Sequence, residues 1–262
     1  MKIATYNINN VVKRLGNLLD WLDDAKPDVV CLQELKAADA DFPIDAVNKA
    51  GYSAVWCGER SWNGVAILSR LGEPVITRES LPGDEKDRQR RYIEAAVNGV
   101  LVACLYAPNG NPQPGPKYDY KLAWHRRFNR HAKELIGSGA PVVLAGDYNI
   151  VPEQRDIYPT KSYDNNALVQ PASREAFKAL LKQGWIDGVR KAFPDETVFT
   201  FWDYRRKRWE RNAGLRLDHL LLSPSLASRL AEVGVDRQVR GAANASDHAP
   251  VWLRLDVVRG SR

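Results

Sequence analysis

The segment from Pro141 to Asn149, which reads PVVLAGDYN, contains residue types and a spacing that suit chemistry at a phosphate. Its apolar run at 142–144 lies between turn formers and contains β-branched residues, which predicts a buried strand. Asp147 and Asn149 follow two residues apart, so in extended backbone their side chains share one face. A carboxylate and a carboxamide at the end of a strand fit a site for a metal and a phosphate. Gly-Asp-Tyr-Asn also fits a simple turn, because Gly, Asp and Asn are turn formers.

Polar residues follow several other apolar runs along the chain. These residues are Asn7, Glu34, Tyr106, Asp218, Asp247 and His248. Each has a structural alternative when taken alone, such as a turn cap or, for Asp218, an ion pair with Arg216. Several oxygen ligands combined with one histidine indicate instead that these residues share a single site.

This oxygen-rich set favours Mg²⁺ as the bound metal. Mg²⁺ usually takes one or two carboxylates together with waters and a substrate phosphate. Glu34 can supply one carboxylate, and either Asp147 or Asp247 can supply another. Zinc is disfavoured because the three cysteines are scattered, at positions 31, 57 and 104, and no histidine-rich spacing occurs.

The same set fits the hydrolysis of a phosphodiester. That reaction needs the nonbridging oxygens neutralised, a water oriented and the leaving oxygen stabilised. Asparagine and tyrosine donate hydrogen bonds to a phosphate without adding negative charge. His248 is the donor of the set that titrates near neutrality, and Asp218 can hold its tautomer. The structural alternative for His248 is a histidine that caps a strand.

Composition is that of a globular protein in a reducing compartment. The 262 residues are 44% hydrophobic, and the odd number of cysteines argues against a disulfide framework. No apolar stretch reaches the length of a membrane span, and the amino terminus lacks the apolar block of a signal peptide. We therefore expect a cytoplasmic location and no membrane partner. The net charge of +6 is compatible with a polyanionic partner such as nucleic acid.

The order of apolar runs predicts one α/β domain spanning residues 1–262. A strand, a helix closed by Pro27 and a second strand open the chain, and a series of short strands in close succession then favours hairpins. A long helix is expected at 117–136 and a short one at 173–183. The closing strands are expected at 198–202, 216–222, 231–236 and 250–257. Two successive strand-rich halves with helices outside them imply two packed sheets.

Eight motifs occur in the order typical of the exonuclease III family of apurinic/apyrimidinic endonucleases, within the endonuclease/exonuclease/phosphatase superfamily, and the chain resembles that family from Lys2 to about Leu255. The motifs are NIN at 7–9, LQE at 32–34, GVAILS at 64–69, YAPNG at 106–110, GDYN at 146–149, FWDYR at 201–205, LRLDH at 215–219 and SDHAP at 246–250. The resemblance implies a four-layer, deoxyribonuclease-I-like sandwich of two mixed β-sheets flanked by helices. Asn109 departs from the pattern, because relatives often have glutamine there.

The resemblance also implies the residues that surround the metal. Glu34 would be the main ligand, with Asn7 and Asp247 nearby. The full set expected at the metal is Glu34, Asn7, Asp147, Asn149, Asp247 and His248. Mg²⁺ would be the ion, and Mn²⁺ could substitute for it. The resemblance leaves open whether one metal acts or two.

The catalytic roles carried over by motif fall on five residues. Asp147 would orient or deprotonate the attacking water, and Asn149 and Tyr106 would contact the scissile phosphate. His248, paired with Asp218, would stabilise the charge that develops on that phosphate. The resemblance leaves the identity of the general base open.

Contacts to DNA are expected from basic, polar and aromatic residues around the site. The residues expected to bind DNA are Arg90, Arg91, Asn109, Trp202, Arg205 and Leu215. Basic clusters at 88–91, 117–127 and 205–211 would follow a phosphate backbone without reading sequence, although solvated faces explain such clusters equally well. Trp202 and Leu215 would form part of an apolar pocket for a base-free sugar, or simply part of the core.

The function that the resemblance implies is a metal-dependent DNA-repair phosphodiesterase of base-excision repair. It would cut duplex DNA 5′ to abasic sites and trim blocked 3′ ends as a 3′–5′ exonuclease, and we expect it to act as a monomer. One alternative is a superfamily phosphatase acting on inositol lipids or small phosphoesters. Another is a non-catalytic DNA-binding relative, which would have no reason to retain Glu34, Asp147 and His248 together.

Overall fold

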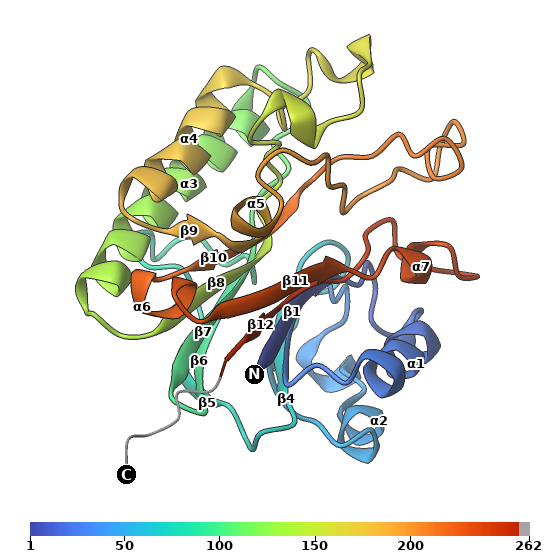
Figure 1. Cartoon of the computed structure of the whole chain (residues 1–262), viewed down its shortest axis with the longest axis vertical. Helices are drawn as coiled ribbons and strands as arrows, with labels where there is room; N and C mark the ends of the chain where they lie inside the picture. Colours follow the sequence, from blue (N-terminus) through green and yellow to red (C-terminus); the bar gives the residue numbers. More distant parts are fainter. Residues whose placement is uncertain (257–262) are drawn as a thin grey trace.

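Two six-stranded mixed sheets pack face to face, with helices on their outer faces (Figure 1). The computed structural model describes residues 1–256. The first sheet has the order β11 (Leu230–Val235), β12 (Val251–Leu255), β1 (Lys2–Asn7), β2 (Val29–Gln33), β4 (Val65–Ser69) and β3 (Ser53–Cys57). The second has the order β5 (Val75–Arg78), β6 (Tyr92–Val97), β7 (Val100–Tyr106), β8 (Val142–Asp147), β10 (Asp218–Leu222) and β9 (Ile186–Asp187).

Each sheet contains one parallel pair at its centre, and each parallel pair is joined by a helical crossover. In the first sheet, α1 (Leu15–Ala25) connects β1 to its parallel neighbour β2. In the second, α3 (Pro116–Gly137) connects β7 to its parallel neighbour β8. Parallel strands direct their carboxyl ends to the same edge of a sheet, so both crossovers bring strand ends together.

The core has three layers that follow the alternation of side chains along the strands. In β2, Val29 and Cys31 face the other sheet, whereas Val30 and Leu32 face the helical side of their own sheet. A third cluster lies between the second sheet and helices α3 and α4 (Pro171–Lys182). Because helices cover the outer faces, the central strands are buried on both sides, and the expected four-layer α/β sandwich is confirmed.

The shorter helices lie mostly in the connections between strands. They are α2 (Ile44–Lys49), α5 (Gly188–Ala192), α6 (Pro224–Ala227) and α7 (Arg237–Arg240), with 3₁₀ turns at Asp39–Asp41, Gln154–Asp156 and Lys161–Tyr163. Within residues 1–256, no helix has both the length and the apolar character needed to cross a bilayer.

Some element boundaries differ from those expected from the sequence. Residues 198–202 form no strand, because Phe201 makes only isolated bridges to Leu215 and His248. Helix α4 begins at Pro171, and Ser173 lies within it with its hydroxyl donating to the Ala167 carbonyl. The last strand ends at Leu255, and the end of the range predicted for it, at 257, lies outside the described residues.

Candidate active site

Strand register places three of the expected residues side by side in the second sheet. Tyr106, the last residue of β7, pairs with Asp147, the last residue of β8. Asp147 in turn pairs with Asp218, the first residue of the antiparallel strand β10. One row of the sheet therefore presents a phenol and two carboxylates where β7 and β8 end and β10 begins.

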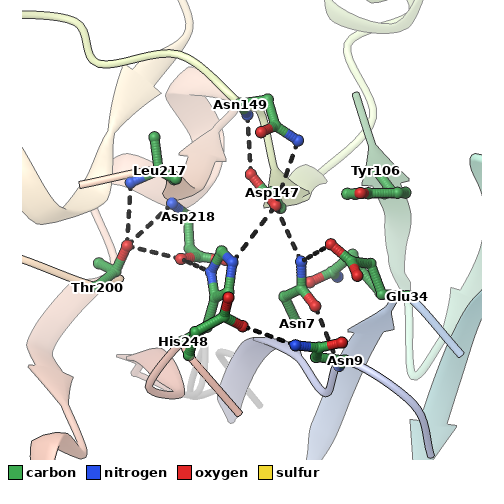
Figure 2. A network of polar contacts seen from close by, with 12 residues as sticks. Asn7, Asn9, Glu34, Tyr106, Asp147, Asn149, Thr200, Leu217, Asp218 and His248 are labelled. Atoms are coloured by element: carbon green, nitrogen blue, oxygen red, sulfur yellow. Dashed lines mark hydrogen bonds and ion pairs between the residues drawn. The ribbon is translucent and has the colours of Figure 1, made fainter. Parts of the chain in front are cut away.

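Asn7 joins this row to the first sheet. It ends β1 beside Gln33 of β2, so Glu34 follows directly on the neighbouring strand. The Asn7 amide donates to Glu34 Oε1 at 2.9 Å and to Asp147 Oδ2 at 3.0 Å (Figure 2). A single carboxamide thus holds one carboxylate from each sheet, and the two carboxylates lie close together across the interface of the sheets.

Asn149 is fixed by the turn that follows β8. Its backbone N–H donates to Asp147 Oδ1 at 2.8 Å, and its backbone has a φ of 50°, in the left-handed region that asparagine tolerates. Its side-chain amide donates to the Ala107 carbonyl at 2.8 Å, and its Oδ1 accepts from Asn109 at 3.0 Å. The turn interpretation of Gly-Asp-Tyr-Asn is therefore correct for Asn149, and the same turn holds its side chain beside Asp147.

His248 stands opposite, held by Asp218. The distance from His248 Nδ1 to Asp218 Oδ2 is 2.8 Å, and Nε2 lies 3.8 Å from Asp147 Oδ2 (Figure 2). Thr200 Oγ1 donates to the same Asp218 oxygen at 2.6 Å. The ring of Phe201 packs edge-on against the imidazole. With Nδ1 bound to Asp218, the imidazole presents Nε2 toward Asp147.

The surroundings shift the pKa values of these two groups upward. Burial lowers the pKa of His248, but the Asp218 carboxylate beside it more than offsets this and raises the pKa to about 10. Burial raises the pKa of Asp147 to about 7, with His248 opposing that shift and Asp218 adding to it. These surroundings therefore favour the protonated form of the His248 imidazole and oppose ionisation of Asp147.

Lys36 is a member of the site that the sequence analysis missed. Its ammonium lies 2.7 Å from Glu34 Oε2 and donates to Asn9 Oδ1 at 2.6 Å. Burial raises the pKa of Glu34, but Lys36 and the Asn7 amide outweigh burial and lower it below its ordinary value. Thr200 was missed as well. Neither residue has a sequence signal, because a lone Lys after a strand and a lone Thr in a loop are both common.

The donor set fits a hard divalent cation. Asp147, Asp218 and His248 each offer a ligand atom within 4.8 Å of the others, and Glu34 is linked to Asp147 through Asn7. Carboxylate oxygens are the ligands that Mg²⁺ prefers. Glu34 is the carboxylate of this set that is partly open to solvent, and Asp147 is linked to it through Asn7, so these two are the carboxylates best placed for a metal.

Asp247, which is expected near the metal, is bound by the side chain of Asn9. Its Oδ1 accepts from the Asn9 amide at 3.0 Å. Asn9 also accepts from Lys36 and donates its backbone N–H to Asn7 Oδ1 at 3.1 Å. Asp247 is therefore connected to the Glu34 side of the site through Asn9 and Lys36.

Tyr106 is a buried phenol at the edge of this group. Burial, followed by the neighbouring carboxylates of Glu34 and Asp147, raises its pKa well above the ordinary value. Its hydroxyl is consequently protonated at any physiological pH and can donate a hydrogen bond. The Arg91 guanidinium lies over its ring, 4.8 Å from the centroid, and donates to its backbone carbonyl.

The expected DNA-binding residues divide into exposed and buried groups. Arg90, Asn109 and Arg205 are exposed, and Arg91 is partly exposed. Trp202 and Leu215 are both fully buried, so in this structure they offer no surface to DNA. The Trp202 indole donates to Asn212, and Leu215 packs in an apolar cluster with Val151, Ile157, Leu168 and Leu217.

The basic cluster expected at 117–127 is likewise partly internal. Lys121 is fully buried and donates to the backbone carbonyls of Asn109 and Asn149, and burial lowers its pKa to about 7. Arg127 is buried against Asp87. Lys121 thus fixes the loops after β7 and β8, and Arg127 holds the connection between β5 and β6, so neither is available to a phosphate backbone, whereas Lys117 and Arg126 are exposed.

Comparison with known proteins agrees with this geometry. The model of the Endonuclease/Exonuclease/phosphatase family matches residues 4–248. The DNA repair nuclease APEX1 of Danio rerio is 33% identical over 98% of this chain and 83% of its own length. Exodeoxyribonuclease III of Haemophilus influenzae is 32% identical over 97% of this chain and its whole length.

Solved structures show the same relationship. An AP endonuclease from Archaeoglobus fulgidus superimposes with a TM-score of 0.93 at 35% identity, and a 3′-5′ exonuclease from Neisseria meningitidis with 0.94 at 37%. Each comparison covers 98% of this chain and all of the other. The chain therefore belongs to the endonuclease/exonuclease/phosphatase family, and the predicted resemblance to its exonuclease III branch is confirmed.

Proposed function

We propose that this protein is a Mg²⁺-dependent DNA-repair phosphodiesterase that cuts duplex DNA 5′ to abasic sites and processes blocked 3′ ends. The observation that carries the proposal is the row of Tyr106, Asp147 and Asp218, with His248 on one side and Glu34 on the other, joined by Asn7. This arrangement surrounds a single position with a hydrogen-bond donor, a carboxylate base, an imidazolium and a metal-binding carboxylate.

Each residue has a role that its surroundings support. A bound Mg²⁺ would polarise the phosphate and stabilise the leaving oxygen, and Glu34 and Asp147 would hold it. Asp147, as a carboxylate, orients the attacking water and accepts its proton. His248, kept protonated by Asp218, donates to a nonbridging oxygen as negative charge develops there. Tyr106 and Asn149 donate further hydrogen bonds to the phosphate.

The relatives and the exposed charge support DNA as the substrate. One structural neighbour, a 3′ phosphatase from Neisseria, is recorded bound to a product DNA hairpin, at a TM-score of 0.93 and 36% identity. The segments around 155–165 and 203–213 extend beyond the sheets (Figure 1). The second segment carries the exposed residues Arg205, Arg206, Lys207 and Arg211. Cationic loops beside the strand ends suit a duplex better than a small phosphoester.

A cleavage assay on two matched duplexes tests the proposal. One duplex contains a single tetrahydrofuran abasic analogue and the other contains an ordinary nucleotide at that position. We expect Mg²⁺-dependent incision 5′ to the analogue, leaving a 3′-hydroxyl, and no incision in EDTA. Incision in EDTA would refute metal dependence. Binding without incision would indicate a non-catalytic relative, and hydrolysis of inositol phosphates alone would indicate a small-molecule phosphatase.

Affinity for undamaged duplex should fall steeply with salt if the exposed basic residues contact phosphates. Replacing Arg205 by alanine removes one cation from the 203–213 segment, so the slope of log affinity against log salt should fall by about one unit. Arg254→Ala is the matched control, because Arg254 is paired with Glu232 on β11 and lies near the opposite end of β12 from His248. Equal slopes for the unmodified protein, Arg205→Ala and Arg254→Ala would show that Arg205 is ordinary solvated surface.

Cleavage should depend on pH with two limbs. The rate should rise as pH increases through about 7, where Asp147 loses its proton, and fall as pH approaches about 10, where His248 loses its charge. A cation beside Asp147 favours its carboxylate, so saturating Mg²⁺ should move the acidic limb to lower pH. The profile of kcat/KM between pH 5 and 10 measures both limbs. An acidic limb that survives in Asp147→Asn would belong to another group.

A further inference from the structure

A cavity of about 530 Å³ opens beside Tyr106, on the side away from His248 and Asp218 in the strand order of the second sheet. Its wall comes from the segment 59–63, the residues just before β6, the loop between β7 and α3, and the first turns of α3. The residues that matter here are Glu59, Trp62, Asn63, Gln89, Arg91 and Tyr106. The volume lies in the range of small-ligand sites and is large enough for one nucleotide.

Trp62 is an exposed aromatic at the edge of this cavity. Its side chain is 72% exposed, whereas Trp124 and Trp202 are buried in the core. The ammonium of Lys36, which is paired with Glu34, lies 5.7 Å from the centroid of its ring. An uncovered indole close to a phosphate site is a suitable platform for a nucleobase, because every base has a face that stacks on an aromatic ring.

The polar side of the cavity is positive. Arg91 is held in place by its stack on Tyr106 and by donating from Nε to Gln89 Oε1 at 2.7 Å. Glu59 is the carboxylate of the wall, but one of its oxygens accepts from Asn63 Nδ2 and the other from the Arg90 backbone N–H, both at 2.7 Å. Glu59 is thus held within the protein, and the two cations of the lining, Arg91 and Lys117, outnumber its charge and are available to a phosphate group.

Asn63, in the wall of the cavity, has a side-chain oxygen that lacks a hydrogen-bond donor among the described residues. It is 3% exposed, and within residues 1–256 its Oδ1 is a buried acceptor without a hydrogen-bond partner. Buried carbonyl oxygens are usually satisfied, and an unpaired one is costly. The N–H groups on the edge of a nucleobase are donors that could satisfy it. A bare sugar phosphate has no such N–H and no flat face for Trp62.

We propose that this cavity is a nucleoside subsite, in which Trp62 stacks on the base of a nucleotide adjoining the phosphate that Tyr106 contacts. The proposal rests on the proposed function, since it places the scissile phosphate at Tyr106. It adds a specificity-determining residue to the site: Trp62 recognises that an ordinary base is present next to the bond that is cut. The contribution should be greatest when a 3′-terminal nucleotide is removed, because an intact base then lies on each side of the scissile phosphate.

Three duplexes with a recessed 3′ end test this subsite. The first has all its bases, the second has an abasic analogue as the terminal nucleotide and the third has one as the penultimate nucleotide. On the first duplex, Trp62→Ala should lower kcat/KM about 10-fold or more, in line with the loss of one base–aromatic stack. Trp62→Phe should retain most of the activity. Val75→Ala, which removes another exposed apolar side chain on β5, should change nothing.

The abasic duplexes identify the stacked base. On one of them the kcat/KM of the unmodified protein divided by that of Trp62→Ala should fall to about one, because the base that Trp62 contacts is already absent. The same ratio on all three duplexes, or no loss on the first, would overturn the subsite. Failure of the unmodified protein to cut any of the three duplexes would instead contradict the proposed function.

Discussion

Replacing Glu34 by alanine should reduce Mg²⁺-dependent incision by roughly two to three orders of magnitude, and excess Mg²⁺ should recover part of the loss. The reason is that Glu34 is a carboxylate at the sheet interface that is partly open to solvent, and its pKa is held below the ordinary value, so it is ionised and ready for a cation. Incision measured against Mg²⁺ concentration should show the half-saturation point moving to higher metal in the variant.

Glu34→Gln separates the loss of charge from the loss of packing. The glutamine carbonyl can still accept the hydrogen bond from Asn7, so the link between the two sheets persists while the anionic ligand is gone. We expect the same loss of activity as in Glu34→Ala, with only a small change in the thermal unfolding temperature from the loss of the ion pair with Lys36. Full activity in Glu34→Gln at low Mg²⁺ would show that Glu34 serves the structure and that the metal binds elsewhere.

Local sequence was sufficient to predict the residues that end strands. Asp147 follows an apolar run that predicts a strand buried on both faces, and Glu34 follows another, so their positions at strand ends could be predicted without knowledge of distant contacts. The spacing of Asp147 and Asn149 predicted side chains on one face of extended backbone, but the strand ends at Asp147 and Asn149 has a φ of 50°, with its backbone N–H donating to Asp147 Oδ1.

Contacts between residues that are distant in the sequence could not be predicted from local sequence. Thr200 reaches Asp218 because the segment around it bridges to residues 215 and 248, and such pairing depends on the whole topology. The expectation that 198–202 is a strand failed for the same reason, since β-propensity does not show whether a partner strand continues alongside.

Burial was the other property that residue type left undetermined. Trp202 and Leu215 are apolar, which fits a sugar pocket and a core equally well, and both are fully buried. Lys121 seemed to belong to a basic surface, yet it caps two backbone carbonyls inside the protein. Exposed Trp62 was overlooked because a single tryptophan in a short loop has no pattern.

Asp147→Asn and His248→Asn should each lower the rate of incision by about two to three decades while leaving affinity for abasic duplex nearly unchanged. Asp147→Asn keeps the shape of the side chain but removes the base that accepts a proton from water. His248→Asn removes the cation that Asp218 sustains beside the phosphate. Single-turnover rates at saturating enzyme, together with equilibrium binding to the same duplex, measure the two effects separately.

The double variant tests whether both groups act on one transition state. His248 Nε2 lies 3.8 Å from Asp147 Oδ2. We therefore expect the fold-loss of incision rate in the double variant to be smaller than the product of the fold-losses in the two single variants. His131→Asn is the matched control, since it removes another buried histidine that contacts a carboxylate, Glu94, outside this site. It should lower stability and leave the incision rate of the folded protein intact. If binding fell in parallel with incision in the Asp147 and His248 variants, these residues would hold the DNA or the fold, and the chemistry would have to be assigned to other groups.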